Sequence, residues 1–276
     1  MVIKILWFGL AFMVAGCGKG LVTLDYLTPS EIDGIQIWLD ADFYFSKGAV
    51  DGTDIFTTYS IGHEWPSEAG MGFPVFFRTG AASDPIFRTS LCPNNQPAID
   101  FSGGSIAYYD NTSFKFTEPL TGVTIFTLLS NGTNVVQGHF GMTSNATSSY
   151  STTDRYILFG QAASGFTSFY LNDGTGGTPA MIDFVTSTDF LGYQLWWSQA
   201  EGRMEVTEIA GQTTTSHTTN TSLNSFNPDS IFEIGRASWG NSVGQICEII
   251  VYNRALSNEE MADVRQYLLN KYTSGS

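Results

Sequence analysis

The chain has 276 residues, of which 42 % are apolar and only 14 % charged, enough for one large all-β domain or two small ones. Its formal charge of −14 argues against a nucleic-acid partner, whose phosphates this surface would repel, and against electrostatic binding to an anionic membrane. The polar surface therefore consists mainly of Ser, Thr, Asn and Gly, a composition typical of extracellular β proteins. The 21 Phe and 12 Tyr favour strands.

The N-terminus "MVIKILWFGLAFMVAGC" has one lysine, then an apolar run from Ile5 to Ala15, then Gly16 and Cys17. This run is too short to span a bilayer and is typical of the hydrophobic region of a signal peptide. "VAGC" resembles the lipobox of bacterial lipoproteins, which predicts cleavage before Cys17 and lipidation of its thiol. An uncleaved membrane anchor or a buried strand is the alternative.

We expect three segments. Residues 1–17 form the signal or anchor, residues 18–33 a tether, and residues 34–272 a single domain that is exported or held at a membrane. The localisation expected is thus a membrane-anchored lipoprotein or an extracellular or virion surface, with membrane contact only through the N-terminus.

Two cysteines remain, Cys92 and Cys247. In an oxidising compartment they could pair. The alternating pattern around Cys247 places it on the same strand face as Ile249 and Val251. We favour a buried free thiol there, packed as a small hydrophobic side chain. No C-x-x-C spacing indicates zinc.

The first half of the chain predicts few but distinct strands. Residues 34–43 alternate as a half-buried strand does, and residues 44–95 indicate long loops with short strands. Residues 96–104 read as a strand that runs into a turn. Residues 121–130 form a continuous apolar run, which predicts a strand buried on both faces. Residues 131–154 are rich in Ser, Thr, Asn and Gly and predict a surface excursion.

The second half of the chain predicts one strand after another. The segments are "RYILFGQ", "FTSFYLND", "AMIDFVT", "LGYQLWWSQ", "RMEVTEIAG", "SIFEIGRA" and "QICEIIVYN". The segment "TTTSHTTNTSLNS" is predicted to be a polar loop. Strands spaced by about eight to twelve residues, without intervening helices, predict an all-β fold: a two-sheet antiparallel sandwich or jelly roll.

The chain ends on a predicted helix that begins with a capping box, Ser257 and Glu260. Its apolar positions fall on one face: Met261, Val264, Leu268 and Leu269. Its charged positions can face water: Glu259, Asp263, Arg265 and Lys271. We expect this helix to cover an open end or edge of the sheets, because bare edge strands invite pairing with other chains.

Four stretches form a recognisable combination: "IQIWLDADF", "NNQPAIDFSGG", "TIFTLLS" and "GQICEIIVYNRALSNEEMADVRQYLLNKY". Together they resemble a laminin-G-like domain of the concanavalin A-like lectin/glucanase superfamily, of the bacterial or phage type. The resemblance spans residues 34–272, with anchors at both ends and a weak middle. It implies a two-sheet antiparallel jelly roll and, usually, binding or adhesion, often to carbohydrate. The superfamily also includes glycoside hydrolases, so the fold does not decide the chemistry.

We expect no catalytic residues. Glucanases of this superfamily carry an E-x-D-x-x-E strand, whereas "EIDGIQ" supplies Glu31, Asp33 and then Gln36, which cannot donate a proton as the general acid. The histidines lie in loops of unlike composition: His63, His139 and His217. Carboxylates that meet from distant strands remain an alternative.

The resemblance also implies a calcium ion as a cofactor, because laminin-G and lectin folds often hold one. The candidate ligands are Asp40, Asp42, Asp51 and Asp54, and separately Asn172 and Asp173. Hard cations need six to eight oxygen ligands, usually pooled from several loops. The alternative is that these side chains only shape turns.

Aromatic residues give the best indication of binding. The candidate ligand-binding residues are Trp65, Tyr109, Trp197, Trp239 and Asn241. Exposed rings beside Asn, Asp and Ser suit sugars, which are apolar on one face and polar at the rim. Trp196 and Trp197 are neighbours in a strand and must point to opposite faces. The alternative, that a ring only caps the core, is favoured for Trp38 and Trp196.

We therefore expect a non-catalytic, extracellular binding or adhesion module whose ligand is a glycan. The alternatives are a virion or surface structural protein of the same fold, whose partner is a protein, and a glycoside hydrolase with an unrecognised carboxylate pair.

Overall fold

The computed structural model describes residues 27–42, 64–66, 75–78, 85–101, 109–111, 122–130, 137–143, 153, 155–163, 166–176, 178–185, 190–198, 202–208, 213–219, 232–237, 240–241 and 244–273. Within these ranges, no helix is long and apolar enough to cross a membrane. Cys17 and the predicted signal segment lie outside them.

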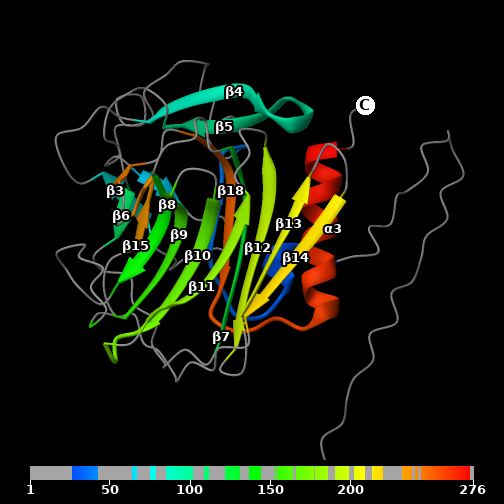
Figure 1. Cartoon of the computed structure of the whole chain (residues 1–276). Helices are drawn as coiled ribbons and strands as arrows, with labels where there is room; N and C mark the ends of the chain where they lie inside the picture. The colour runs from blue at the N-terminus through cyan, green and yellow to red at the C-terminus, as the bar shows by residue number, and fades with distance from the viewer. Residues whose placement is uncertain are drawn as a thin grey trace, which may run out of the picture.

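Two eight-stranded antiparallel sheets face each other (Figure 1). Sheet A contains β1 (Ile35–Asp40), β4 (Ile86–Cys92), β5 (Gln96–Asp100), β7 (Gly122–Ser130), β12 (Leu191–Ser198), β13 (Gly202–Glu208), β14 (Thr213–Thr219) and β18 (Gln245–Tyr252). Its order is β14-β13-β12-β7-β18-β5-β4, and β1 also pairs with β18.

Sheet B contains β2 (Glu64–Pro66), β3 (Val75–Arg78), β6 (Tyr109–Asn111), β8 (Gln137–Thr143), β9 (Arg155–Ala163), β10 (Phe166–Asp173), β11 (Ala180–Val185) and β15 (Phe232–Ile234), in the order β11-β10-β9-β8-β15-β6-β3-β2. A small ribbon joins β16 (Arg236–Ala237) to β17 (Gly240–Asn241). Two short 3-10 helices, η1 (Pro29–Glu31) and η2 (Pro93–Asn95), precede β1 and β5. The two-sheet antiparallel sandwich predicted from the sequence is confirmed.

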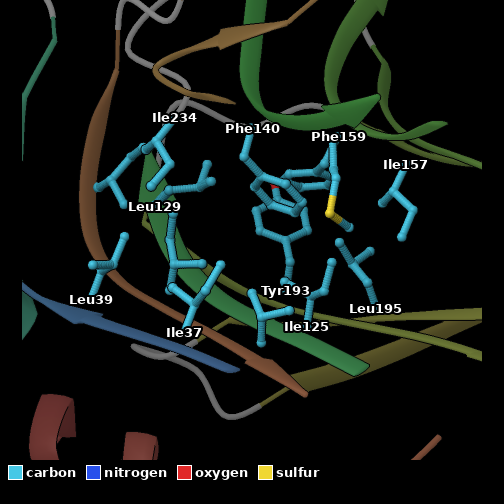
Figure 2. Close-up of a cluster of buried hydrophobic side chains, with 14 of the residues drawn as sticks. Ile37, Leu39, Ile125, Leu129, Phe140, Ile157, Phe159, Tyr193, Leu195 and Ile234 are labelled. Carbon is cyan, nitrogen blue, oxygen red and sulfur yellow. The ribbon is translucent and has the colours of Figure 1, made fainter. Parts of the chain in front are cut away.

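The main core fills the space between the sheets (Figure 2). Alternate residues of β1, β7, β9, β10 and β12 point into it, as the period-two pattern requires. Tyr193 of sheet A packs against Phe159 of sheet B with ring centroids 5.0 Å apart, and Phe140 lies 5.1 Å from Phe159. These rings join the two layers where β12 crosses β8 and β9.

Strand β7 is buried on both faces, as its apolar run predicts: all nine of its residues are buried. Ile125 and Leu129 face the main core, whereas Phe126 and Leu128 belong to a second apolar cluster on the opposite face of sheet A. That second cluster includes residues of the C-terminal helix, which explains why a sandwich strand is buried on its outer face.

Helix α3 (Asn258–Thr273) lies against the outer face of sheet A (Figure 1). The prediction that it covers an end or edge of the sheets is therefore wrong. The capping box is present, because Ser257 N–H donates to Glu260 Oε2 at 2.8 Å and Glu260 N–H donates to Ser257 Oγ at 3.2 Å. Met261, Val264 and Leu268 are buried as predicted, whereas Leu269 is only partly buried. Tyr272, which the predicted face did not include, is buried as well.

The linker between β18 and α3 is fixed to the sheet. Thr124 Oγ1 donates to the Arg254 carbonyl at 2.9 Å and accepts from Leu256 N–H at 3.0 Å, while Trp196 Nε1 donates to the Leu256 carbonyl at 2.9 Å. A Cβ on Gly122 would lie 2.5 Å from the Ala255 nitrogen, so only glycine permits this close approach. Together these contacts determine where the helix begins.

A buried polar network holds the other end of the helix to the sheet. The Glu248 carboxylate of β18 is fully buried and accepts hydrogen bonds from Trp38 Nε1 at 2.7 Å and Tyr272 OH at 2.9 Å. Tyr267 OH donates to the same carboxylate at 3.0 Å, and Lys271 Nζ contacts it at 3.1 Å. Four donors thus compensate for the loss of hydration of one carboxylate.

Lys271 also forms an ion pair with Asp40, and its side chain is only 14 % exposed. The prediction that Lys271 faces water is therefore wrong. Burial alone would lower the pKa of Lys271, but the negative charges of Glu248 and Asp40 outweigh it and raise that pKa. Burial raises the pKa of Glu248, although the Lys271 charge opposes this shift. The position of Lys271 on the helix could not predict this burial, because its acidic partners lie on strands β1 and β18.

Cys92 and Cys247 form a disulfide, so the expected free thiol is wrong. A register shift between Ile246 and Glu248 explains the error. It turns Cys247 toward the second cluster, whereas Ile249 stays in the main core. The bond connects β18 to the end of β4 across 155 residues of chain, a long loop whose closure restricts the unfolded state.

Strands β8 and β14 lie where the sequence predicted a surface excursion and a polar loop. Strand β8 falls within residues 131–154, and its residues 138–143 are buried in the middle of sheet B. Strand β14, which includes His217, falls in the predicted polar loop. It is the last strand in the order of sheet A, where β-branched threonines suit the backbone and no apolar alternation is required.

We expect Lys271→Met to lower the free energy of unfolding by about 3 kcal/mol or more, because it leaves buried carboxylates without their cation. Chemical denaturation measures this quantity. Arg88→Met is the control, since the Arg88 side chain is 34 % exposed beside Asp100 and should cost about 1 kcal/mol or less. Equal losses in the two variants would contradict this account of the network.

Candidate functional site

The outer face of sheet B carries the candidate site. Because Phe169 and Leu171 of β10 lie in the main core, the alternate residues of this strand face outward. They are Phe166, Ser168, Tyr170 and Asn172. The same alternation places Met181 and Asp183 of β11 on the outer face, since Ile182 is a core residue.

Strand register aligns these outward residues into a row across the sheet. Tyr170 pairs with Met181 on one side and Leu158 on the other. Leu158 pairs with Gly141, which pairs with Glu233. We call Met181, Tyr170, Leu158, Gly141 and Glu233 the outer row; it crosses β11, β10, β9, β8 and β15.

Exposure changes along the outer row. Met181 is 47 % exposed and Tyr170 is half-buried, whereas Leu158 and Glu233 are 2 % and 0 % exposed. Leu158 forms a small apolar cluster with Tyr156, against which Tyr170 packs. The row therefore offers accessible apolar and aromatic surface over β10 and β11 and a buried carboxylate over β15.

A polar pair lies beside Tyr170. Ser168 Oγ donates to Asp183 Oδ1 at 2.5 Å, and these two residues are directly paired across β10 and β11. Burial, followed by the nearby Asp183 charge, raises the pKa of Tyr170, although its hydrogen bond with Ser168 opposes the shift. The Tyr170 hydroxyl thus remains protonated at neutral pH and can donate or accept a hydrogen bond. We call Phe166, Ser168, Tyr170, Met181 and Asp183 the β10–β11 patch.

The residues predicted to bind ligand do not gather at this patch. Trp197 is fully buried in the main core, which corrects its assignment to a ligand surface. Trp196 lies on the opposite face of β12, in the cluster beneath α3, so the two rings do point in opposite directions. Trp239 lies outside the described residues.

The other three predicted positions are described only by their backbone. Trp65 lies in β2 and pairs with Phe76, and Tyr109 lies in β6 and pairs with the core residue Ile234. Asn241 lies in β17 and pairs with Arg236.

The predicted metal ligands are partly described. Asp40 ends β1 and is paired with Lys271, so a cation of the protein itself occupies that carboxylate. Asp42 lies next to it, its backbone N–H donating to Asp40 Oδ1 at 2.9 Å, and burial raises the pKa of Asp42. Asp51 and Asp54 lie outside the described residues. Among the residues that the structure describes, no group of three or more His, Cys, Asp or Glu is arranged to hold a metal ion.

The segment "EIDGIQ" has a local role in the structure. Glu31 accepts from the Thr28 backbone N–H at 2.7 Å and so caps η1. The Asp33 carbonyl accepts from Arg254 Nε at 2.9 Å, and Gln36 donates to the carbonyl of Ile35. This segment therefore shapes the entry to β1 and its contact with the linker before α3.

Tyr170, Asp183 and Glu233 are not among the site residues predicted from the sequence. The signal was present in "FTSFYLND" and "AMIDFV", where alternation separates core from outward positions. Alternation does not show which face of a sandwich strand is accessible; that depends on what covers each face in the folded protein. It also does not align β10 with β15, which are distant in the chain, and this alignment depends on strand register.

Comparisons with known proteins support the fold alone. No protein-family model matches the sequence, and no curated protein matches it. Among solved structures, domain 4 of the GH43 extracellular arabinanase AbnA from Geobacillus stearothermophilus, in complex with arabinotriose, is similar with a TM-score of 0.54 and 11 % identity, over 83 % of this chain and 97 % of that chain.

Two longer proteins share the fold over part of their length. A GH54 α-L-arabinofuranosidase soaked with 4-nitrophenyl α-L-arabinofuranoside has a TM-score of 0.56 and 11 % identity, over 76 % of this chain and 50 % of that chain. The binding domain of botulinum neurotoxin DC in complex with SialylT has a TM-score of 0.51 and 9 % identity, over 89 % of this chain and 53 % of that chain. This chain thus spans about half the length of these two proteins.

His139 of β8 predicts a pH dependence of stability. It is fully buried, and burial lowers its pKa from 6.5 to about 3. The unfolded state therefore binds a proton between these pH values that the folded state does not. The stability that neutral His139 contributes is complete above pH 6.5 and is lost as the pH falls toward 3.

We expect unfolding free energies measured from pH 7 to pH 3.5 to fall more steeply for the wild-type protein than for His139→Gln. Each pKa unit corresponds to about 1.4 kcal/mol, so the difference should reach a few kcal/mol. The carboxylates titrate in both proteins and cancel in the comparison. Parallel curves would show that His139 does not cause the dependence.

Proposed function

We propose that the protein is a non-catalytic glycan-binding module whose ligand lies on the outer face of sheet B. The observation that carries this proposal is the β10–β11 patch, where accessible apolar and aromatic side chains adjoin a hydrogen-bonded Ser168–Asp183 pair. Sugar rings require both features, because their C–H faces pack on apolar surface while their hydroxyls need donors and acceptors.

The accessible part of the outer row lies over β10 and β11, because Leu158 and Glu233 are 2 % and 0 % exposed. Phe166 and Tyr170 lie four residues apart on the same face of β10, about 13 Å at about 3.3 Å per residue, which is the length of about two to three sugar rings. The β10–β11 patch therefore suits an oligosaccharide rather than a single sugar. The fold neighbours in complex with arabinotriose and SialylT are consistent with this proposal, although they share only the fold.

We further propose that the domain is exported and tethered through a lipidated Cys17. The Cys92–Cys247 disulfide supports export, because such bonds persist in oxidising compartments. Mass spectrometry of the mature N-terminus tests this proposal: a diacylglyceryl group on an N-terminal Cys17 is expected, and an intact Met1 would contradict it.

We expect Tyr170→Ala to weaken oligosaccharide binding about tenfold or more, because it removes an aromatic contact from the centre of the patch. A glycan array identifies a bound oligosaccharide, and calorimetry then measures its dissociation constant for each variant. Tyr170→Phe should retain the stacking contribution and lose only the hydroxyl. Leu91→Ala is the control, since Leu91 is 41 % exposed but lies in β4 of sheet A. Equal effects of Tyr170→Ala and Leu91→Ala would exclude the patch as the binding surface.

One observation favours glycoside hydrolysis as a second candidate. Glu233 and Asp110 are directly paired across β15 and β6, so two carboxylic residues from distant parts of the chain are adjacent in sheet B. Hydrolysis of a glycosidic bond requires two such groups. Our proposal expects no release of reducing sugar from the bound oligosaccharide. Release that Glu233→Gln abolishes would establish the enzyme instead.

A further inference from the structure

We propose that Asp183 makes the site selective for neutral oligosaccharides over those that carry carboxylate or sulfate groups. This inference rests on the proposed function, because it concerns the ligand class of the same β10–β11 patch. It assigns Asp183 as a specificity-determining residue.

The position of Asp183 is the first step. It lies opposite Ser168 in the β10–β11 register and on the same face as the neighbouring Tyr170–Met181 pair. Ser168 Oγ donates to one carboxylate oxygen at 2.5 Å and so orients the group. Among the residues that the structure describes, no donor contacts the second carboxylate oxygen. This oxygen can therefore accept a hydrogen bond from a hydroxyl of a sugar that stacks on Tyr170.

The charge of the patch is the second step. The outward residues around Asp183 are an aromatic ring, a hydroxyl and a thioether, and none of these carries a positive charge: Tyr170, Ser168 and Met181. Burial, followed by the Asp183 charge, raises the pKa of Tyr170, so this carboxyl group is close enough to act on a ligand that lies over the ring. A ligand carboxylate placed here would meet a like charge, which opposes binding.

The net charge of −14 on the whole chain also repels acidic ligands, but this charge is not confined to the patch. Salt screens such long-range repulsion beyond about 8 Å at physiological ionic strength. A local effect of Asp183 is therefore separable from the overall charge by a matched substitution elsewhere. Asp263 of α3 provides it, because α3 covers the outer face of sheet A and Asp263→Asn removes the same charge far from the patch.

The experiment compares neutral and acidic ligands of equal length in calorimetric titrations of the full domain. The neutral probes are arabinotriose, xylotriose and galactotriose, and the acidic probes are trigalacturonate and a sialylated trisaccharide. We expect the best neutral probe to bind at least about tenfold more tightly than either acidic probe. Asp183→Asn should reduce this ratio severalfold, whereas Asp263→Asn should leave it unchanged.

Ser168→Ala gives a second variant that keeps the charge. It should weaken neutral binding by losing the orientation of Asp183, and it should preserve the preference for neutral probes. If Asp183→Asn binds no probe, the neutral-to-acidic affinity ratios of Ser168→Ala and of the wild-type protein test the selectivity instead. For the wild type, raising the salt concentration should strengthen acidic binding relative to neutral binding.

Two failures are distinguishable. Acidic probes that bind the wild type as tightly as neutral probes would overturn the selectivity and leave glycan binding intact. An unchanged ratio in Asp183→Asn would also overturn it. The absence of any binding, to these probes and on the glycan array, would instead refute the proposed function.

Discussion

The burial of Glu248 beneath helix α3 connects β1, β18 and the helix. A carboxylate with no exposed surface is tolerated only when donors surround it, and here they come from β1 and from the last turns of α3. Lys271 supplies the compensating charge and pairs with Asp40. Because these partners are far apart in the sequence, the network can form only when β1, β18 and α3 are all in place.

The outer faces of the two sheets differ in what covers them. The outer face of sheet A is occupied by α3, the fixed linker that precedes it and the cluster around Phe126 and Trp196. The outer face of sheet B instead presents the β10–β11 patch, with Tyr170 and Met181 accessible to solvent. The proposed ligand surface therefore lies on sheet B, because α3 covers the outer face of sheet A.

Several features were predictable because they depend on short stretches of chain. The β-sandwich followed from alternation and spacing, and the start of α3 followed from the Ser257–Glu260 capping box. The continuous apolar run of β7 correctly predicted burial on both faces. The polar sequences of β8 and β14 gave no such signal, since these strands form through pairing with neighbours rather than through an apolar pattern of their own.

The sequence by itself thus determined the class of fold, the buried faces of its strongest elements and a net charge of −14. The tertiary structure alone decided that Cys247 bonds to Cys92, that Lys271 is buried rather than exposed, and that Tyr170, Asp183 and Glu233 share one face. The physical reason is the same in each case. A local pattern fixes which side of an element a residue occupies, whereas the partner on that side depends on strand register and on bulges, which join residues far apart in the chain.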